Sequence, residues 1–231
     1  LADDARRRHL YEGEIFVFSP RPSTVALCNH CREMIEEAFH PHDPRTIHEV
    51  LPVEECVQVL TKLKPAFIHH PKSKELIQAM LRDLGGDPDK IHFDVPRMRS
   101  AYPKDYLAAG IAYAFHPHRD TWYSAPMCQL NWWLPVYEML PENCMAFYPG
   151  RFSRPVKNSS EIYNYYEWNA KNRATAAQHV KTDTREQPKP QEALEDEPQL
   201  RVICPPGGLL LFSAAQLHAT VPNTAGIARY S

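Results

Sequence analysis

The sequence predicts an α+β chain that is mainly β, with a helical layer over residues 1–90 followed by a jelly roll over residues 91–231. Apolar residues recur at helical spacing in the first part of the chain. In the second part they form short runs rich in β-branched and aromatic residues, separated by Pro, Asn and Gly, as in two-sheet β proteins. Because 231 residues suit one domain with a substantial core, we expect residues 1–231 to be a single domain.

The helical layer is predicted to contain three amphipathic helices. The first is expected to begin at Ser23 or Thr24, which can cap it, and the second opens at Pro52, a residue type favoured in a first turn. The third is capped by Ser73 and ends at the glycine pair 85–86. Their apolar stripes are formed by Leu27, Cys31, Met34, Ile35 and Ala38, by Leu60 and Leu63, and by Leu76, Ile77, Met80, Leu81 and Leu84.

The strands of the jelly roll are predicted where β-branched and aromatic residues cluster between turn-forming residues. These runs lie at residues 91–95, 111–115, 128–137, 143–150, 200–204, 208–213 and 217–221.

A long polar stretch, residues 152–199, interrupts this series of strands. Its first half places Tyr163, Tyr165, Tyr166 and Trp168 on a predicted helix, and its end is rich in Pro and Glu. A connection of this length is either a disordered loop or a lid over a binding site. We favour a lid with a mobile acidic end, because the aromatic half can pack whereas the acidic half cannot.

Charge and composition exclude several classes of partner. The formal net charge is -2, and no stripe of Lys and Arg predicts binding to nucleic acid. No apolar run approaches the roughly 20 residues of a membrane span, and the N-terminal residues lack a secretory signal, so we expect a cytoplasmic protein without membrane contact. The 6 cysteines are sparse and are expected to be reduced thiols. A small molecule is the expected partner, and the oligomeric state is left open.

An H-x-D motif suggests a metal site at His118 and Asp120. On a strand, residues two apart share a face, so this imidazole and this carboxylate can bind one cation. A histidine from another strand, with His218 as the candidate, would complete a facial triad with three open positions, as in non-haem iron oxygenases. The same spacing occurs at His92 and Asp94, so the motif alone does not identify the site.

The features that follow the first motif decide between the two pairs. Residues 145–150 read M-x-F-x-P-G, His218 follows a Gly-rich strand, and Arg229 comes 11 positions after His218. In this order the chain resembles the phytanoyl-CoA hydroxylase-like group of iron(II)/2-oxoglutarate oxygenases, and the resemblance covers residues 91–231. The chain departs from the group in the Arg151-Phe152 pair, where Ser-His is frequent, and in the long insertion. Both departures bear on substrate access more than on metal binding.

This resemblance implies a cupin-like double-stranded β-helix that binds Fe(II), 2-oxoglutarate and O2. His118, Asp120 and His218 would hold the metal, and Arg229 would bind the far carboxylate of 2-oxoglutarate, with Ser231 as an additional donor. The implied reaction hydroxylates, desaturates or cyclises a small molecule and releases succinate and CO2. Because Asp120 is present where halogenating relatives have Gly or Ala, halogenation is not implied.

Two pairs of residues before and after the motif are candidates for substrate contacts. Arg97 and Arg99 share a face of a predicted strand and can meet an anionic group, or they form a solvated pair. Gln129 and Asn131, with Trp133, share a face that points into the barrel or outward. In the second case the core would instead be formed by Leu130, Trp132 and Leu134.

Two other functions remain open at this stage. One is a cupin-like metalloenzyme that uses the same three ligands without 2-oxoglutarate, and the other is a non-catalytic jelly-roll binding module. Arg229 argues against the first, because that chemistry needs no cation at this position. The complete set of metal ligands argues against the second.

Overall fold

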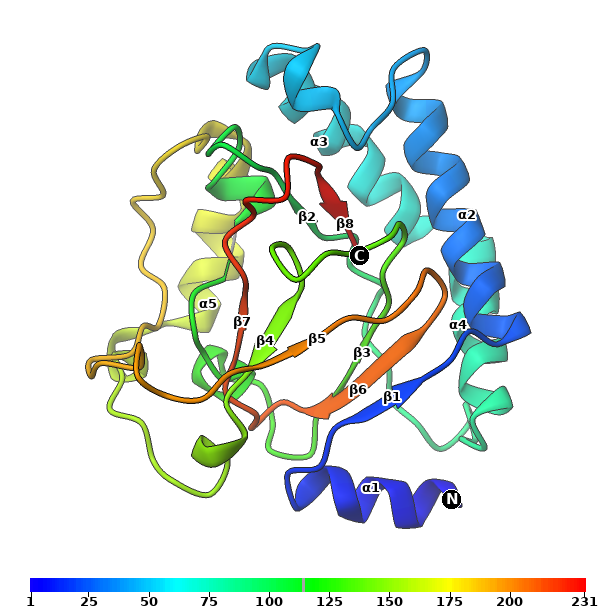
Figure 1. Ribbon diagram of the computed structural model, residues 1–231, viewed down its shortest axis with the longest axis vertical. Coiled ribbons are helices and arrows are strands. Elements are labelled where there is room, and N and C mark those ends of the chain that lie inside the picture. The colour runs from blue at the N-terminus through cyan, green and yellow to red at the C-terminus, as the bar shows by residue number, and fades with distance from the viewer. Residues whose placement is uncertain (114) are drawn as a thin grey trace.

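The computed structural model describes residues 1–113 and 115–231, and combines a layer of helices with three small antiparallel sheets (Figure 1). The helices are α1 (Asp3–Tyr11), α2 (Pro22–Phe39), α3 (Val53–His69), α4 (Pro71–Asp83) and the short α5 (Tyr165–Glu167), and the strands are β1 (Phe16–Phe18), β2 (Ser100–Ala101), β3 (Leu130–Trp133), β4 (Met145–Phe147), β5 (Leu200–Val202), β6 (Leu209–Ser213), β7 (His218–Thr220) and β8 (Arg229–Tyr230).

The strands pair across long sequence separations. The sheet orders are β1-β6-β3, β5-β4-β7 and β2-β8, and every pair is antiparallel. The central strand β6 is buried along its whole length, because its two faces meet different cores. Leu209 and Leu211 pack toward the helices, whereas Leu210 and Phe212 pack with Phe147 of β4. This strand therefore joins the helical layer to the interior of the sheets.

The predicted helical layer is confirmed, with shifted boundaries at two helices. Helix α2 begins at Pro22, and α3 follows Pro52 as expected. Helix α4 begins two residues before Ser73, which is therefore not its cap. The buried Ser73 hydroxyl instead donates to the Phe67 carbonyl, which ties α4 to α3. A proline at the first helical position does not need its missing N–H, which explains the earlier start at Pro71.

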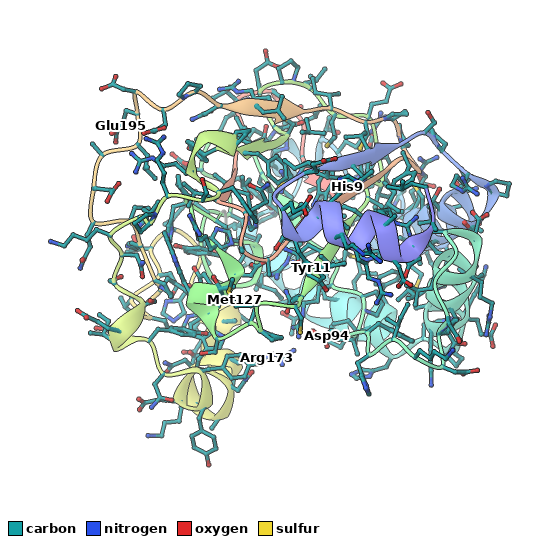
Figure 2. The ribbon with its side chains drawn as sticks, turned by 90° about the horizontal axis from the view of Figure 1, so that it is seen from below. His9, Tyr11, Asp94, Met127, Arg173 and Glu195 are labelled. Carbon is teal, nitrogen blue, oxygen red and sulfur yellow. The ribbon has the colours of Figure 1, made fainter. Side chains whose placement is uncertain are left out.

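Two elements of the first ninety residues were not predicted. Helix α1 lies across one end of the molecule, where Figure 2 shows its residues His9 and Tyr11, and the Tyr11 hydroxyl donates to the Cys128 carbonyl at 2.9 Å. Strand β1 follows it and pairs with β6. A three-residue strand has too few residues for a periodic signal, and only its distant partner defines it.

The strand content is lower than the sequence predicted. The longest strand, β6, has 5 residues, whereas α2 has 18, so the expectation of a mainly β chain is corrected to a mixed one. Residues 91–95 form no strand, because the structure gives them no ladder partner, although Ile91 and Phe93 still pack on the helical core. The predicted strand 111–115 is also wrong where it is described: Gly110–Ala112 form a 3₁₀ helix, and residue 114 lies outside the described residues. The other predicted runs contain β3 to β7.

The insertion 152–199 packs against the rest of the protein at both ends. Backbone N–H groups of Ala108 and Ala109 donate to the Val180 carbonyl, and the Gly110 N–H donates to the Asp183 carboxylate. At the acidic end, Arg151 forms ion pairs with Glu192 at 2.7 Å and with Glu197. The expectation that the acidic half cannot pack is therefore wrong, since arginines outside it supply the missing partners.

No helix in the described part of the chain is long and apolar enough to cross a membrane. All six cysteines are free thiols in the structure, as expected, and Cys31 is buried in the helical core.

Replacing Gly110 with Ala is expected to lower the free energy of unfolding by about 2–5 kcal/mol. The Gly110 φ of +61° is unfavourable for Ala, and an added Cβ would collide with the carbonyl oxygens of Ala176 and His179 in the insertion. Urea unfolding measures the loss, and proteolysis within 152–199 should accelerate.

The matched control is Gly85→Ala, where φ is +82° but no atom lies within 4 Å of the added Cβ. It should show the backbone strain alone, about 1 kcal/mol. Equal losses in the two variants would contradict close docking of the insertion.

Candidate metal centre

The two candidate metal-binding histidines lie directly opposite each other across an antiparallel bridge. The His118 N–H donates to the His218 carbonyl at 2.9 Å, and the His218 N–H donates to the His118 carbonyl at 3.0 Å. Opposed side chains of such a pair lie on the same face, and the two ring centroids are 4.3 Å apart. Both residues are 4% exposed. The fold thus brings together two imidazoles that are far apart in the sequence.

Backbone carbonyls fix the orientation of both rings. His118 Nδ1 lies 2.8 Å from the His116 carbonyl oxygen, and His218 Nδ1 lies 2.9 Å from the Gln216 carbonyl oxygen. A carbonyl can only accept, so each Nδ1 carries the proton and each neutral ring presents a free lone pair on Nε2. These two partners could not be predicted from the sequence, because any residue supplies a carbonyl.

Asp120 supplies the third ligand from the first turn of a 3₁₀ helix, Asp120–Tyr123, and not from a strand as predicted. Its N–H donates to the Ala214 carbonyl at 3.0 Å, which fixes the backbone. One carboxylate oxygen, Oδ1, lies 3.4 Å from His118 Nε2, and the other, Oδ2, accepts a hydrogen bond from the Asn131 amide. Gln129 in turn donates to Asn131 Oδ1 at 3.0 Å. Oδ1 is left to face the histidines.

The electrostatics of the cluster favour the protonation states that bind a metal. Burial by itself would raise the pKa of Asp120, but the adjacent His118 ring, whose Nε2 lies 3.4 Å from Oδ1, the nearby His218 and the Asn131 amide hold it below its usual range. Burial lowers the pKa of His218 to about 4, with a further contribution from His118, while Asp120 opposes the shift. At neutral pH the carboxylate is therefore ionised and His218 is neutral.

These three residues fit one divalent transition-metal ion. One ligand atom from each lies within 4.8 Å of the other two, so bonds of about 2.1 Å require only a small contraction of the cluster. Two histidines and one carboxylate on one side of an ion leave positions open on the other, the donor set of non-haem Fe(II) sites. No other group of three such ligands is found among the residues that the structure describes. His92 and Asp94 are exposed, and Asp94 pairs with Arg97 instead.

A buried arginine, Arg229, lies against Trp133, which shares a face of β3 with Asn131. Arg229 is 5% exposed, and its guanidinium carbon lies 5.6 Å from the centre of the Trp133 ring. Trp133 follows Asn131 by two residues on β3, so the two side chains share a face and are separated by about 7 Å along the strand. The predicted interior face of β3 is therefore the one with Gln129, Asn131 and Trp133, while Leu130 and Trp132 pack on the helical core.

The Arg229 guanidinium has no acidic partner among the described residues. Nη1 donates to the carbonyls of Asn143 at 2.9 Å and Cys144 at 3.2 Å, whereas Nε is buried without a hydrogen-bond acceptor. Burial lowers its pKa to about 10, and Arg99 adds to the shift, so the group stays charged at neutral pH. The Ser231 hydroxyl, two residues on, is likewise buried without a partner. An unpaired buried cation is costly, so this position favours an anion.

The two arginines before the motif have different surroundings. Arg97 forms an exposed ion pair with Asp94 at 2.8 Å. Arg99 is joined to the last residue by reciprocal backbone hydrogen bonds with Ser231, at 2.7 and 3.0 Å, and its guanidinium carbon lies 5.1 Å from the centre of the Phe115 ring. That ring lies 5.0 Å from the ring of His118. The structure thus brings Arg99, and not Arg97, next to the metal-binding cluster.

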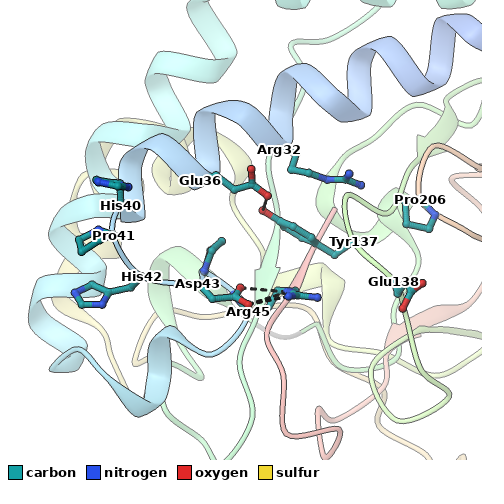
Figure 3. Close-up of a pocket in the computed structure, with 11 residues that line it drawn as sticks. Arg32, Glu36, His40, Pro41, His42, Asp43, Arg45, Tyr137, Glu138 and Pro206 are labelled. Atoms are coloured by element: carbon teal, nitrogen blue, oxygen red, sulfur yellow. Dashed lines mark hydrogen bonds and ion pairs between the residues drawn. The ribbon is translucent and has the colours of Figure 1, made fainter.

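A separate pocket, of about 570 Å³, lies between the end of α2 and the loop after β3 (Figure 3). Its two arginines already have partners: Arg45 pairs with Asp43 at 2.8 Å, and Arg32 donates to the Val136 carbonyl at 2.7 Å. Both guanidinium groups lie over the ring of Tyr137. These satisfied groups explain the pocket as a structural feature of the helical layer.

Comparison with solved structures places the chain among 2-oxoglutarate-dependent enzymes in fold. EvdO2 from Micromonospora carbonacea var. aurantiaca, crystallised with 2-oxoglutarate, superimposes with a TM-score of 0.52 at 14% identity, over 100% of this chain and 88% of EvdO2. SnoK, a non-haem α-ketoglutarate-dependent carbocyclase of nogalamycin biosynthesis, gives a TM-score of 0.48 at 15% identity, over 100% of this chain and 81% of SnoK. No protein-family model and no curated protein sequence matches the chain. The likeness to EvdO2 shows the fold and agrees with the resemblance predicted from the sequence.

Replacing Asn131 with Ala is expected to weaken Fe(II) binding by about 10- to 100-fold, because the Asp120 carboxylate loses the amide that orients it. Anaerobic titration calorimetry with Fe(II) measures the affinity. Asp120→Ala should abolish binding, and His92→Ala, which removes the other H-x-D histidine, should leave it unchanged. A loss of affinity in the His92 variant would contradict the assignment.

Proposed function

We propose that the protein is an Fe(II)- and 2-oxoglutarate-dependent dioxygenase that oxidises a small molecule. The observation that carries this proposal is the buried, unpaired guanidinium of Arg229, which lies against Trp133, two residues along β3 from the Asn131 that binds Asp120. A metal cluster alone suits many enzymes, but a buried cation near the same interior face suits a short dicarboxylate that also binds the metal. Of the two open alternatives, a metalloenzyme without this co-substrate leaves the charge of Arg229 unexplained.

Each residue of the proposed site would have a specific part in binding. His118, Asp120 and His218 would hold Fe(II), and Arg229 would bind the far carboxylate of 2-oxoglutarate through its free N–H groups, with the Ser231 hydroxyl as a further donor. Trp133 would cover the aliphatic part of the co-substrate, because its ring lies against Arg229 on the interior side of β3. Bound together, Fe(II), 2-oxoglutarate and O2 supply the oxidising chemistry, with release of succinate and CO2. Asn131 would keep Asp120 from rotating away from the ion.

The sheets and the insertion would act together as one catalytic domain. We infer that the three sheets form a double-stranded β-helix over residues 91–231, backed by the helices of residues 1–90. The alignment of EvdO2 over the whole chain supports a single domain of 1–231. Residues 152–199 would serve as the lid, since they reach the metal site through Tyr163, whose ring lies 5.3 Å from that of Tyr123. The intact ligands favour hydroxylation, desaturation or ring closure.

Arg229→Gln is expected to raise the 2-oxoglutarate concentration needed for half-saturation by about 10- to 100-fold, because hydrogen bonds to the far carboxylate lose their charge. The measurement is the metal-to-ligand charge-transfer absorbance of the anaerobic Fe(II) protein during a 2-oxoglutarate titration. Arg229→Lys should give an intermediate loss, since an ammonium cannot bind a carboxylate bidentately.

Ser231→Ala serves as the milder control, with an expected loss of a few-fold. Unchanged Fe(II) affinity and circular dichroism will show that the Arg229 variants are folded. If the wild-type protein binds Fe(II) but develops no charge-transfer band with 2-oxoglutarate, the metalloenzyme without this co-substrate is the correct function.

A further inference from the structure

A second arginine on the open side of the metal site also lacks a counter-ion. Among the residues that the structure describes, no carboxylate lies within ion-pair distance of Arg99. Its side chain is accessible to solvent, unlike that of Arg229. Crowding by the surrounding protein lowers the pKa of Arg99, and the nearby charges of Arg97 and Arg173 add to this, while Asp120 opposes it. Once a metal ion neutralises Asp120, little negative charge remains to balance Arg99.

A tyrosine hydroxyl beside Arg99 needs a hydrogen-bond acceptor. The Tyr123 oxygen is buried and has no partner among the described residues, and its ring lies 5.4 Å from the ring of His118. Burial raises the pKa of Tyr123, helped by the neighbouring Tyr113, Tyr163 and Asp120 and opposed by Arg99, so the hydroxyl stays protonated at neutral pH. Tyr123 therefore presents an unsatisfied buried donor, and Arg99 an unpaired charge, next to the candidate metal ligands.

We propose that Arg99 and Tyr123 bind an oxyanion, a carboxylate or a phosphate, of an aromatic substrate on the open side of the metal. This proposal rests on the proposed function and names the class of substrate. The guanidinium supplies charge-assisted hydrogen bonds and the phenol supplies a neutral one. The Phe115 ring contacts both the Arg99 guanidinium and the His118 ring, so an acidic group bound by Arg99 would be held beside the candidate metal site.

A row of aromatic rings leads from this donor pair into the insertion. The Tyr123 ring lies 5.3 Å from that of Tyr163, which lies 6.3 Å from that of Trp168. Tyr163 and Trp168 line a cavity of about 430 Å³ together with Arg185, which is paired with Asp183 and holds its guanidinium 4.6 Å from the centre of the Trp168 ring. Flat rings stack well on such a wall. The aromatic part of the substrate would then lie against these rings, under the proposed lid.

Positive charges near Arg99 add to the attraction of an anion. The positive charges of Arg97 and Arg173 both lower the pKa of Arg99. The same two charges lower the pKa of Asp94, the acid beside them. Figure 2 shows Asp94 and Arg173 close together on the face seen from below. Two arginines sharing this single acid leave a positive entrance, which favours an acidic substrate over a neutral one.

The test uses three probes that differ only in the group expected to meet Arg99: 2-naphthoate, 2-naphthyl phosphate and the neutral 2-naphthamide. Each is titrated anaerobically into the protein loaded with Fe(II) and 2-oxoglutarate, and binding is followed by the change in the charge-transfer band and by calorimetry. We expect at least one anion to bind at least about 10-fold more tightly than the amide. Which anion binds better decides between carboxylate and phosphate.

Arg99→Gln should weaken binding of the anion by about 10- to 100-fold, and Tyr123→Phe by about 5-fold, without a comparable change for naphthamide. The 2-oxoglutarate affinity of Arg99→Gln should stay within about 3-fold of wild type. Arg45→Gln, which removes a positive charge at the separate pocket, is the matched control and should leave anion binding unchanged.

Three results would overturn the proposal. The first is that all three probes bind equally or that none binds. The second is that the Arg99 variant loses affinity for 2-oxoglutarate and not for the anion. The third is that the Arg45 variant loses as much anion affinity as the Arg99 variant. Absence of the charge-transfer band in the wild-type protein is a different result, because it removes the proposed function itself.

Discussion

Two reciprocal hydrogen bonds between the backbones of His118 and His218 hold the whole site together. They put two imidazoles on one face of a two-residue bridge, and the carbonyls of His116 and Gln216 turn both Nε2 atoms toward the same point. Asp120 can then be added by a single turn of helix. If the pairing shifted by one residue, the two rings would no longer share a face, so the cluster exists only in this register.

The interior is organised around positive charge. Arg229 is a buried cation, and a metal ion held by the candidate ligands would be a second one, each with a desolvation cost that protein groups only partly offset. Backbone carbonyls accept from Arg229 and the Asp120 carboxylate faces the candidate metal position, so a ligand with a negative charge at each end would balance both. The interior row on β3 sets their spacing, because Asn131 supports the acid and Trp133 lies against the arginine.

The helical layer and the insertion contact this interior through different elements. β3 and β6 direct one face to the core of α2, α3 and α4 and the other to the site, so neither strand can show the simple alternation of a half-exposed sheet. The insertion brings the ring of Tyr163 against that of Tyr123, beside His118, while its backbone is anchored near Gly110 and its acids near Arg151.

The sequence by itself determined the helices α2 to α4, the strands β3 to β7 and the three candidate metal-binding residues, whose role stays a prediction. Helical stripes and runs of apolar residues are local signals, and the ligands stand in an order that a family resemblance recognises. Only the tertiary structure decided that Asp120 is on a 3₁₀ turn, that 91–95 has no strand partner, and that Arg99 and not Arg97 reaches the metal-binding cluster. The reason is that strand pairing, burial and charge compensation depend on distant segments: β1, β2 and β8 are defined by partners far away in the chain, and the carbonyls that orient the histidines leave no mark on the sequence.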